Sequence, residues 1–269
     1  MLGLKKELFG EISHPGETVG RFTAEIEKAV GYSADVVLCA SHDTSSAVIA
    51  APIREDSVFI SSGTWSLLGV ELRKAVVSQE AVEADFSNEG ATDGKYQLLK
   101  NLTGLWLIQE TRKELNRAEG KEYSFAELTE LALENEIAQT FDTEDALFSS
   151  PESMIAAIDK KMGRRLNVGE RAYCIFNSLA KKYAETVERL EGLCKKKFRA
   201  INVIGGGGKN QLLNNLTAKW SGKSVVIGPY ECSAIGNLLL QMIASGAVED
   251  VAAARELVEH SFGTMVIMH

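Results

Sequence analysis

Two separate segments of the sequence combine residue types that could handle a phosphorylated ligand. Residues 41–44 read Ser-His-Asp-Thr and follow an apolar run at 36–40, while residues 205–208 are four consecutive glycines after another apolar run. At the end of a strand that faces a crevice, the Asp43 carboxylate can accept a proton from a sugar hydroxyl that attacks phosphorus. Consecutive glycines let a backbone approach phosphates closely, and the N-terminus of a following helix adds positive potential. Together the segments predict a proton acceptor and a cradle for a phosphate or nucleotide.

The first segment also has a purely structural interpretation. Asp43 or Thr44 could cap a helix over 45–51 by accepting from its free amides, which is more common than catalysis. His42 is one of only four histidines, and no second ligand lies at helical spacing. It is therefore predicted to pack or to orient a neighbour rather than to bind a metal. Adjacency in sequence does not by itself indicate a Ser-His-Asp triad.

The glycine segment matches neither of two common phosphate-binding patterns. It is neither Gly-x-x-x-x-Gly-Lys-Ser nor Gly-x-Gly-x-x-Gly, so a tight structural turn is the alternative. The absence of the second pattern, with its downstream acidic residue, disfavours a dinucleotide-binding oxidoreductase. Residues 61–64, Ser-Ser-Gly-Thr, make a similar hydroxyl-rich turn, for which a plain hairpin loop is the alternative. Two such turns predict two clamps on one polyphosphate.

Composition indicates an acidic globular protein. The chain has 269 residues, 45% of them hydrophobic and 25% charged, with a formal net charge of −8. Nucleic acid or an anionic membrane is therefore a poor partner, although local amides and a metal ion still allow ATP to bind. No apolar run approaches the ~20 residues that span a bilayer. Four cysteines without a Cys-x-x-Cys pair predict reduced thiols in a cytoplasmic protein: Cys39, Cys174, Cys194 and Cys232.

Hydrophobic periodicity predicts the strands and helices that would position these segments. Apolar runs predict a buried strand at 36–40, two strands around a turn within 57–70, and strands at 200–204 and 224–227. Helical spacing and cap residues predict helices at 45–51, 104–117, 125–139, 152–162, 170–197, 210–220, 233–245 and 251–260. The alternation in the second half favours an α/β fold with helices on a sheet.

Several blocks recur in the same order in a known family. They are 40–44 (Ala-Ser-His-Asp-Thr), 61–66 (Ser-Ser-Gly-Thr-Trp-Ser), 88–90 (Asn-Glu-Gly), 100–101 (Lys-Asn), 104–106 (Gly-Leu-Trp), 205–207 with Asn210, 228–229 (Gly-Pro) and 236–237 (Gly-Asn). On these blocks the chain resembles the FGGY carbohydrate kinases over about residues 10–262. The blocks at 61–66 and 88–90 resemble the members that act on L-rhamnulose, whereas the His-Asp pair and the glycines indicate only the broad superfamily.

The resemblance implies a fold and a division of the chain. The fold would be α/β, of the actin-like ATPase type: the C-terminal lobe of a sugar kinase, with a ribonuclease-H-like core and a mixed sheet flanked by helices. Residues 1–35 would be an inter-lobe connecting segment, and residues 36–269 would be the nucleotide-binding kinase domain. Family members carry an N-terminal lobe before this region, with most of the sugar contacts. Weak ATP binding and little activity are therefore expected of these 269 residues alone.

The resemblance also implies roles for particular residues. Asp43 would be the catalytic base that takes the proton from the C1 hydroxyl of the sugar, and His42 would lie beside it in the sugar site. Mg²⁺ would bridge the phosphates of ATP, with no metal ligands assigned on the protein. The positions aligned with nucleotide contacts are Thr64 in the phosphate turn, Asn101, Gln109, Gly206 and Gly207 beside the adenosine, and Asn210.

Substrate and partners follow from the same resemblance. The implied reaction is the ATP-dependent conversion of L-rhamnulose to L-rhamnulose 1-phosphate, with L-fuculose and D-xylulose as alternative sugars. A non-catalytic dimerising or regulatory domain is an alternative of a different class. Apolar surface would be exposed where an N-terminal lobe packs, and such a surface favours self-association.

Overall fold

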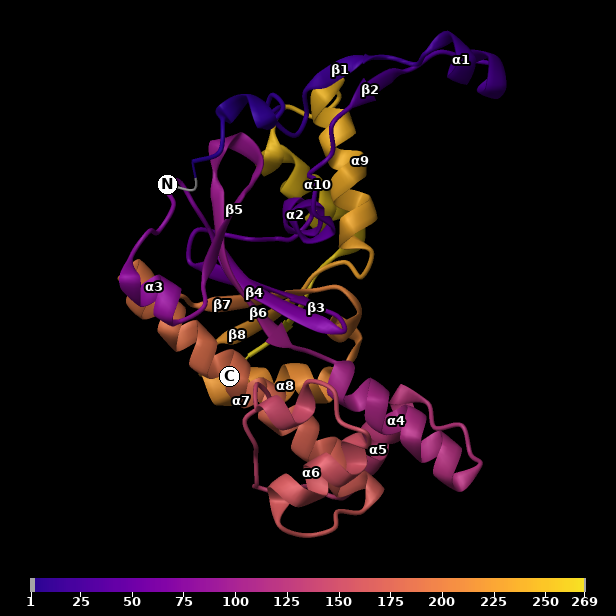
Figure 1. Ribbon diagram of the computed structural model, residues 1–269, viewed down its shortest axis with the longest axis vertical. Coiled ribbons are helices and arrows are strands. Elements are labelled where there is room, and N and C mark those ends of the chain that lie inside the picture. The colour runs from indigo at the N-terminus through magenta and orange to yellow at the C-terminus, as the bar shows by residue number, and fades with distance from the viewer. Residues whose placement is uncertain (1–2, 269) are drawn as a thin grey trace.

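The computed structural model describes residues 3–268, and a mixed sheet of seven strands crosses its centre (Figure 1). These strands are β3 (Ser57–Ser62), β4 (Trp65–Leu72), β5 (Ser87–Gly90), β6 (Tyr96–Thr103), β7 (Ala200–Ile204), β8 (Ser224–Ile227) and β9 (Met265–Ile267). Their order across the sheet is β5-β6-β4-β3-β7-β8-β9. β7 runs parallel to both β3 and β8, and the other neighbours are antiparallel.

Helices cover both faces of this sheet (Figure 1). The helices are α1 (Ala24–Val30), α2 (Asp43–Ile49), α3 (Gln79–Glu83), α4 (Trp106–Glu119), α5 (Phe125–Glu134), α6 (Met154–Met162), α7 (Val168–Cys194), α8 (Gln211–Ser221), α9 (Cys232–Ala244) and α10 (Val251–Phe262). α2, α9 and α10 pack on one face, α7 and α8 pack on the other, and α4, α5 and α6 gather at one end beside α7. This arrangement confirms the predicted α/β fold with a mixed sheet flanked by helices.

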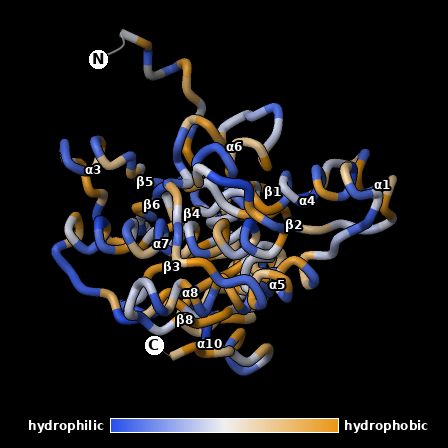
Figure 2. Tube along the Cα trace, turned by 90° about the horizontal axis from the view of Figure 1, so that it is seen from below, coloured by the Kyte–Doolittle hydropathy of each residue, from blue (hydrophilic) through white to orange (hydrophobic). Residues whose placement is uncertain are grey.

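The alternation of side chains along β3 builds a core on each face of the sheet. Val58 and Ile60 belong to the core with α7 and α8, whereas Phe59 belongs to the core with α2, α9 and α10. All three side chains are fully buried. Successive side chains of a strand point to opposite faces, so a strand covered on both sides reads as a continuous apolar run. Figure 2 shows this hydrophobic character of the trace at β3 and β8.

Most of the elements predicted from periodicity are present. Strands at 200–204 and 224–227 have the predicted bounds, and 57–70 folds as the strand pair β3 and β4. The predicted helices are present with shifted ends; α5, for example, stops at Glu134 instead of 139. The sequence does not predict β5, because it is a short polar strand at the edge of the sheet and its side chains are exposed or half-buried. Such a strand contains no alternating apolar residues, so the pattern that identifies half-buried strands is absent.

The prediction of a buried strand at 36–40 is wrong. Only Asp35–Val37 forms a strand, β2, and it pairs with β1 (Thr18–Arg21) in a separate two-stranded sheet. No residue of either strand is buried. A five-residue apolar run does not distinguish a core strand from one side of an exposed hairpin, because the pattern does not reveal the partner.

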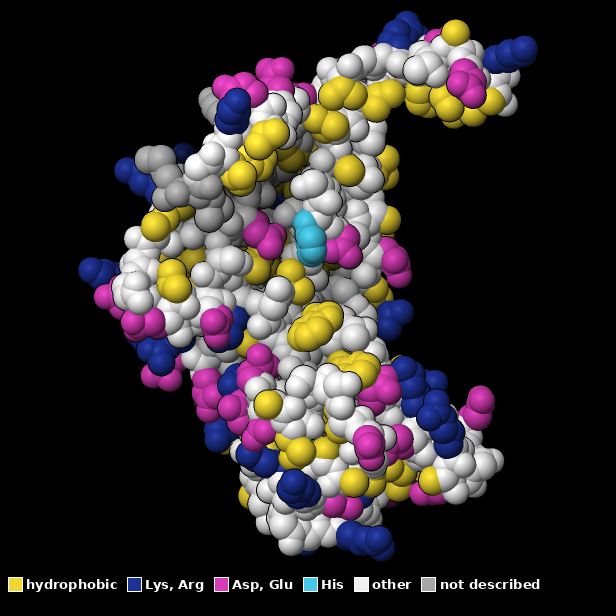
Figure 3. Space-filling model, in the orientation of Figure 1, with side chains coloured by type: hydrophobic (Ala, Val, Ile, Leu, Met, Phe, Trp, Pro, Cys, Tyr) yellow, Lys and Arg dark blue, Asp and Glu magenta, His cyan; other side chains and the backbone are white. Residues whose placement is uncertain are grey.

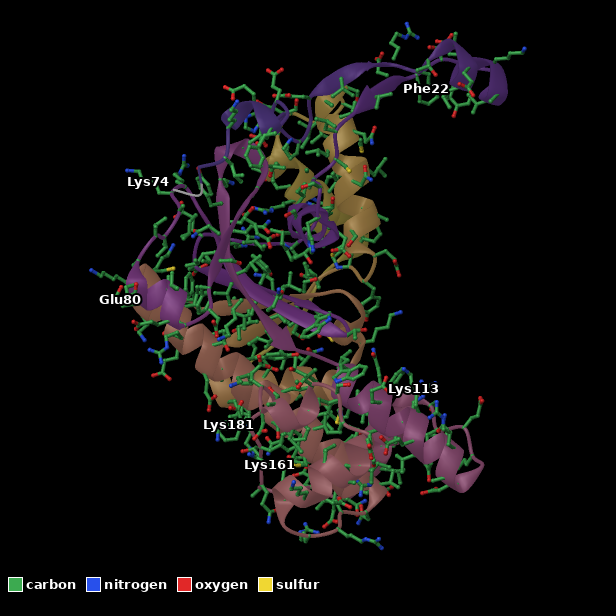
Figure 4. All side chains as sticks on the ribbon, viewed as in Figure 1. Phe22, Lys74, Glu80, Lys113, Lys161 and Lys181 are labelled. Atoms are coloured by element: carbon green, nitrogen blue, oxygen red, sulfur yellow. The ribbon has the colours of Figure 1, made fainter. Side chains whose placement is uncertain are left out.

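β1, α1 and β2 form an arm that projects from the body (Figure 1). No residue of α1 is buried, and Phe22, labelled in Figure 4, lies on this arm. Figure 3 shows hydrophobic side chains gathered along it. The large exposed ones are Val19, Ile26, Val30, Tyr32 and Val36. This agrees with the expected exposure of apolar surface, while self-association and a domain boundary at residue 35 stay predictions.

A buried carboxylate near the end of α7 makes the fold sensitive to acid. Glu191 accepts hydrogen bonds from Lys197 Nζ and Lys223 Nζ at 2.6 Å each, and from the backbone amide of Phe198 at 2.9 Å. Burial alone would raise the pKa of Glu191, but these three partners outweigh it and lower the pKa to about 2. A lowered folded-state pKa contributes stability that is present above the unfolded-state pKa, near 4.5, and is lost as the pH falls toward 2.

Glu191→Gln is therefore expected to lower the free energy of unfolding by about 2 kcal/mol at pH 7, and the difference should shrink toward zero near pH 2. Urea unfolding of both proteins across this pH range measures the effect. The control is Glu188→Gln, which removes an exposed carboxylate from the same helix and should change stability by less than about 0.5 kcal/mol. If Glu191→Gln lowers the free energy of unfolding by the same amount at every pH, the lowered pKa of Glu191 does not stabilise the fold.

Candidate active site

Two parallel strands bring the predicted phosphate turns to one edge of the sheet. β3 and β7 are neighbours that run in the same direction and end at Ser62 and Ile204. The hairpin turn at 63–64 follows the first strand, and the glycine turn at 205–208 follows the second. Ligands of open α/β sheets bind outside the carboxyl ends of the strands. The sheet thus places the two turns next to each other, as two clamps on one ligand require.

Asp43 begins α2 instead of following a strand of the main sheet. Its side chain is 79% exposed, and the backbone amide of Thr44 donates to its Oδ1 at 2.7 Å. The backbone carbonyl of Asp43 accepts from Ser233 Oγ at 3.1 Å, which joins the start of α2 to the start of α9. Thr44 Oγ1 lies 3.5 Å from Ser61 Oγ on β3. Asp43 therefore offers an accessible carboxylate beside the carboxyl end of β3.

His42 is the N-cap of α2. Its Nδ1 accepts the backbone amide of Thr44 at 3.2 Å, which leaves the other ring nitrogen for contacts with a ligand. Nδ1 also lies 3.2 Å from Asp43 Oδ1. The backbone amide of Thr44 is thus shared between the two side chains. A helix cap at 41–44 is thus present, but it is His42 and not the predicted Asp43 or Thr44 that provides it. The Asp43 carboxylate stays accessible.

The glycine turn fits tightly against β3 at one position and is open at the next. Gly205 has a φ of +83°, in the region that L side chains rarely adopt. A Cβ on Gly207 would lie 1.9 Å from Ser62 Oγ, whereas a Cβ on Gly206 would meet nothing within 4 Å. The turn is therefore held by the strand at Gly207 and leaves the backbone of Gly206 accessible to a ligand.

Asn210 closes the glycine turn and starts α8. Its Oδ1 accepts the amide of Leu213 at 2.9 Å and makes it the N-cap of that helix. One turn further along, Asn214 Nδ2 donates to the carbonyl of Gly208 at 3.0 Å and holds the turn on the helix. The side-chain oxygen of Asn210 is thus used in the cap, so any contact with a nucleotide would come from its Nδ2 group.

The hairpin turn joins two of the predicted nucleotide contacts. Thr64 Oγ1 donates to Gln109 Oε1 at 3.2 Å. The backbone amide of Leu105 donates to the carbonyl of Gly63 at 2.9 Å, and that of Trp106 donates to the carbonyl of Thr64 at 3.1 Å. The start of α4 is therefore fixed to the turn that carries Thr64, and Gln109 moves with it.

Asn101 stands apart from the other candidates. It lies on β6 opposite Leu67 of β4 and is exposed. Within residues 3–268 no hydrogen bond joins its side chain to the remaining candidate residues. β6 pairs with β4, one of the two strands that the hairpin turn joins, and no contact among the described residues assigns Asn101 a ligand.

A cavity of about 470 Å³ opens beside Thr64. Its walls are Thr64, Trp65, Thr103, Trp106, Thr143, Glu144, Asp145, Phe148 and Ser149. Most of its polar groups are used inside the protein: Glu144 Oε1 accepts the amide of Thr103 at 2.8 Å, and the indole of Trp106 donates to the carbonyl of Phe148 at 3.3 Å. A larger cavity of about 890 Å³ lies between α3 and α7 and contains none of the candidate residues.

A glycine at the crossing of α2 and α9 sets the position of Asp43. A Cβ on Gly236 would lie 1.7 Å from the carbonyl oxygen of Ser46. The two helices therefore touch backbone to backbone, one turn from the hydrogen bond between Ser233 and Asp43. Any side chain at 236 would push α2, and the Asp43 carboxylate with it, away from α9.

Sequence reasoning missed the buried polar residues behind the site. Ser66 Oγ and the hydroxyl of Tyr183 are 2.6 Å apart in the core, and Ser233 holds the carbonyl of Asp43. Tyr183 lies on the apolar face of the predicted helix 170–197, so its spacing signals only core packing. The serine doublet at 61–62 was a visible signal, although it indicated a hairpin turn and not which serine points inward.

Clusters of metal-ligating side chains and helices that could span a membrane are both absent from residues 3–268. Within residues 3–268 no group of three or more His, Cys, Asp or Glu side chains could hold a metal ion. None of the helices in that same stretch has both the length and the apolar character needed to cross a bilayer. The four cysteines are free thiols, two buried, one half-buried and one exposed.

Comparison with known proteins gives one family. The model of the C-terminal domain of the FGGY family of carbohydrate kinases matches residues 58–245. A rhamnulokinase of Halalkalibacterium halodurans is 41% identical over 266 residues, which are 97% of this chain and 56% of the relative. A rhamnulokinase of Oceanobacillus iheyensis is 39% identical with the same coverage. The chain thus spans about half the length of the curated relatives it matches.

Solved structures share the fold. A ligand-bound xylulose kinase from Lactobacillus acidophilus superposes with a TM-score of 0.74 at 15% identity, over 98% of this chain and 53% of that protein. A gluconate kinase from the same organism gives a TM-score of 0.74 at 17% identity, with the same coverage. Likeness at such low identity concerns the fold alone, and it agrees with the predicted lobe of a sugar kinase.

Proposed function

Because this chain belongs to the FGGY family of carbohydrate kinases, we propose that its site transfers the γ-phosphate of ATP to the C1 hydroxyl of L-rhamnulose. The proposal rests on one observation: the exposed Asp43 carboxylate, the hairpin turn and the glycine turn lie at one edge of the sheet. Curated relatives that bear the name rhamnulokinase support the choice of sugar. A cytoplasmic location stays a prediction from composition.

Asp43 acts as the base in this reaction. Its carboxylate accepts the proton of the C1 hydroxyl as that oxygen attacks the γ-phosphorus in line, and ADP leaves. The amide of Thr44 holds Oδ1, which leaves Oδ2 for the hydroxyl. His42 offers its second ring nitrogen to the same sugar. Positioning of hydroxyl and phosphate accounts for much of the expected acceleration.

The two turns suit a nucleotide. The backbone of Gly206 is open to a ligand, and the N-terminus of α8, a helix of 11 residues, follows directly and favours negative charge. Buried Ser62 Oγ has no hydrogen-bond partner within residues 3–268, so the turn region contains a spare polar group. Thr64 and Gln109 would contact the nucleotide from the hairpin side. Mg²⁺, held chiefly by phosphate oxygens and water, would neutralise charge on the transferred phosphoryl group.

The identity of the sugar is the least constrained part of the proposal. L-Fuculose and D-xylulose are the alternatives, and the solved xylulose kinase shares only the fold with this chain. We expect the chain alone to phosphorylate any of the three slowly or not at all, since it spans 56% of the curated relatives. A coupled assay that compares the three sugars tests this, and robust turnover of L-rhamnulose by the chain alone contradicts it.

Calorimetric titration with ATP and Mg²⁺ tests the nucleotide site directly. We expect weak binding by the chain, and at least a tenfold further loss of affinity in Gly206→Ala, because the added methyl group would occupy the space open to the ligand. The unfolding midpoint without nucleotide should not change. Gly192→Ala is the control, because it fills equally open space on α7, far from the turns.

The outcomes of this titration separate two classes of function. Equal ATP affinities of Gly206→Ala and the parent would show that the glycine turn is not part of the nucleotide site. No heat and no rise in melting temperature at millimolar nucleotide, with the parent chain, would favour a non-catalytic dimerising or regulatory domain. The exposed arm is the feature that such a domain would use.

A further inference from the structure

Three hydroxyl groups meet in the core directly behind the hairpin turn. Ser62 and Ser66 are cross-strand partners on β3 and β4, and both side chains are buried. The hydroxyl of Tyr183, from the middle of α7, lies 2.6 Å from Ser66 Oγ. Lys181, labelled in Figure 4, marks the same turn of this helix. We call Ser62, Ser66 and Tyr183 the hydroxyl cluster.

The hydroxyl cluster lies against two glycines that begin other parts of the site. A Cβ on Gly207 would be 1.9 Å from Ser62 Oγ, so the glycine turn rests on that serine. A Cβ on Gly104 would be 2.8 Å from Ser66 Oγ, so the segment that enters α4 rests on the other serine. The cluster thus touches the hairpin turn, the glycine turn and the approach to α4, which are the three segments with the proposed nucleotide contacts.

These hydroxyls are unusual for their surroundings. Tyr183 is 2% exposed and packs within the apolar core shared by α7 and the sheet. Burial raises the pKa of Tyr183 to about 12, so its hydroxyl keeps its proton at any ordinary pH. Phenylalanine would fill the same space without a polar group to satisfy, and buried hydroxyls are unfavourable unless they are hydrogen-bonded. The hydroxyl therefore needs an explanation other than packing.

We propose that Tyr183 is a positioning residue that fixes the distance between the glycine turn and the hairpin turn through the hydroxyl cluster. Its hydrogen bond holds Ser66, and the cross-strand pair carries that constraint to Ser62, on which Gly207 rests. Two turns that bind one polyphosphate must keep a fixed separation. Turns that are mobile in the free protein must be ordered when the ligand binds, and that entropic cost lowers the affinity. Tyr183 is fully buried behind the sheet and does not touch the ligand.

Hydrogen exchange tests this positioning without any ligand. In Tyr183→Phe we expect the backbone amides of Gly208 and Leu105, which donate to the carbonyls of Gly205 and Gly63, to lose about tenfold of their protection, while global unfolding shifts by only a few degrees. The matched control is Thr186→Val, which removes another buried hydroxyl of α7, one that donates to the carbonyl of Lys182 in its own helix. Unchanged exchange in Tyr183→Phe, or the same change in Thr186→Val, overturns the proposal.

Nucleotide binding supplies the second readout, which rests on the function proposed above. Where the parent chain binds ATP with Mg²⁺, Tyr183→Phe should raise the dissociation constant for ATP by about tenfold, and Thr186→Val should bind ATP like the parent. A parent that binds no ATP refutes the proposed function, whereas the exchange result still decides on the cluster. Equal ATP affinities of the parent and of Tyr183→Phe refute only the role of Tyr183 and leave the proposed function standing.

Discussion

Asp43→Asn is expected to lower the rate of sugar phosphorylation by about 10²- to 10⁴-fold, the usual contribution of a positioned general base. Asparagine keeps the size of the side chain and can still accept the amide of Thr44 through its oxygen, but it cannot take a proton from the sugar. The capping hydrogen bonds of α2 should therefore survive, and ATP affinity and melting temperature should stay close to those of the parent.

The measurement needs a protein with robust turnover. A fusion of this chain with the remainder of the Halalkalibacterium halodurans relative, which the chain covers to 56%, would provide it. Asp56→Asn in the same fusion is the matched control, because Asp56 is a half-exposed carboxylate paired with Arg199 on another part of the surface. An Asp43→Asn protein that works at the parent rate would exclude Asp43 as the base, whatever its affinity for ATP.

Gly236→Ala is expected to destabilise the fold by about 3 kcal/mol or more. The new Cβ would lie 1.7 Å from the carbonyl oxygen of Ser46, a backbone atom that cannot move without shifting α2. The helix pair would have to separate, and the hydrogen bond from Ser233 to the carbonyl of Asp43 would break. Urea unfolding monitored by circular dichroism gives the loss of stability, and the fusion protein gives the accompanying loss of turnover.

Gly192→Ala is the opposite case on another helix. Gly192 is exposed near the end of α7, and a Cβ there would meet nothing within 4 Å. Alanine should therefore stabilise the protein by about 0.5–1 kcal/mol, because it restricts the unfolded chain and favours the helix. Should both glycine variants unfold at the same urea concentration, the close contact between α2 and α9 would not be a determinant of stability.

The sequence predicts those elements whose own residues show a strong preference for one structure. The strand at 200–204 and the four glycines after it are recognisable because β-branched residues end abruptly at residues that no regular element tolerates. The pairing of β3 with β7, which brings the two turns together, is not in either segment. It depends on the contacts that residues 63–199 make with both faces of the sheet, so it could be expected only from the general rules of α/β folds.

The candidate site shows the same division. Asp43, Thr64 and Gly207 stand out in the sequence because each lies at a turn that follows an apolar run, although a helix cap or a plain turn would also account for each of them. Tyr183 is invisible, because a tyrosine on an apolar helix face is ordinary and only its 2.6 Å contact with Ser66 sets it apart. The misplaced strand at 36–40 has the same cause: five apolar residues do not say which partner will pair with them.

The two serines at the end of β3 face opposite sides of the sheet, since Ser61 approaches Thr44 of α2 while Ser62 supports Gly207. A single residue deleted before Ser61 would bring Ser62 to the side of α2 and place Gly63 against the glycine turn, which would then lose its supporting hydroxyl. The length of β3, Ser57–Ser62, therefore links the start of α2 to the support of the glycine turn.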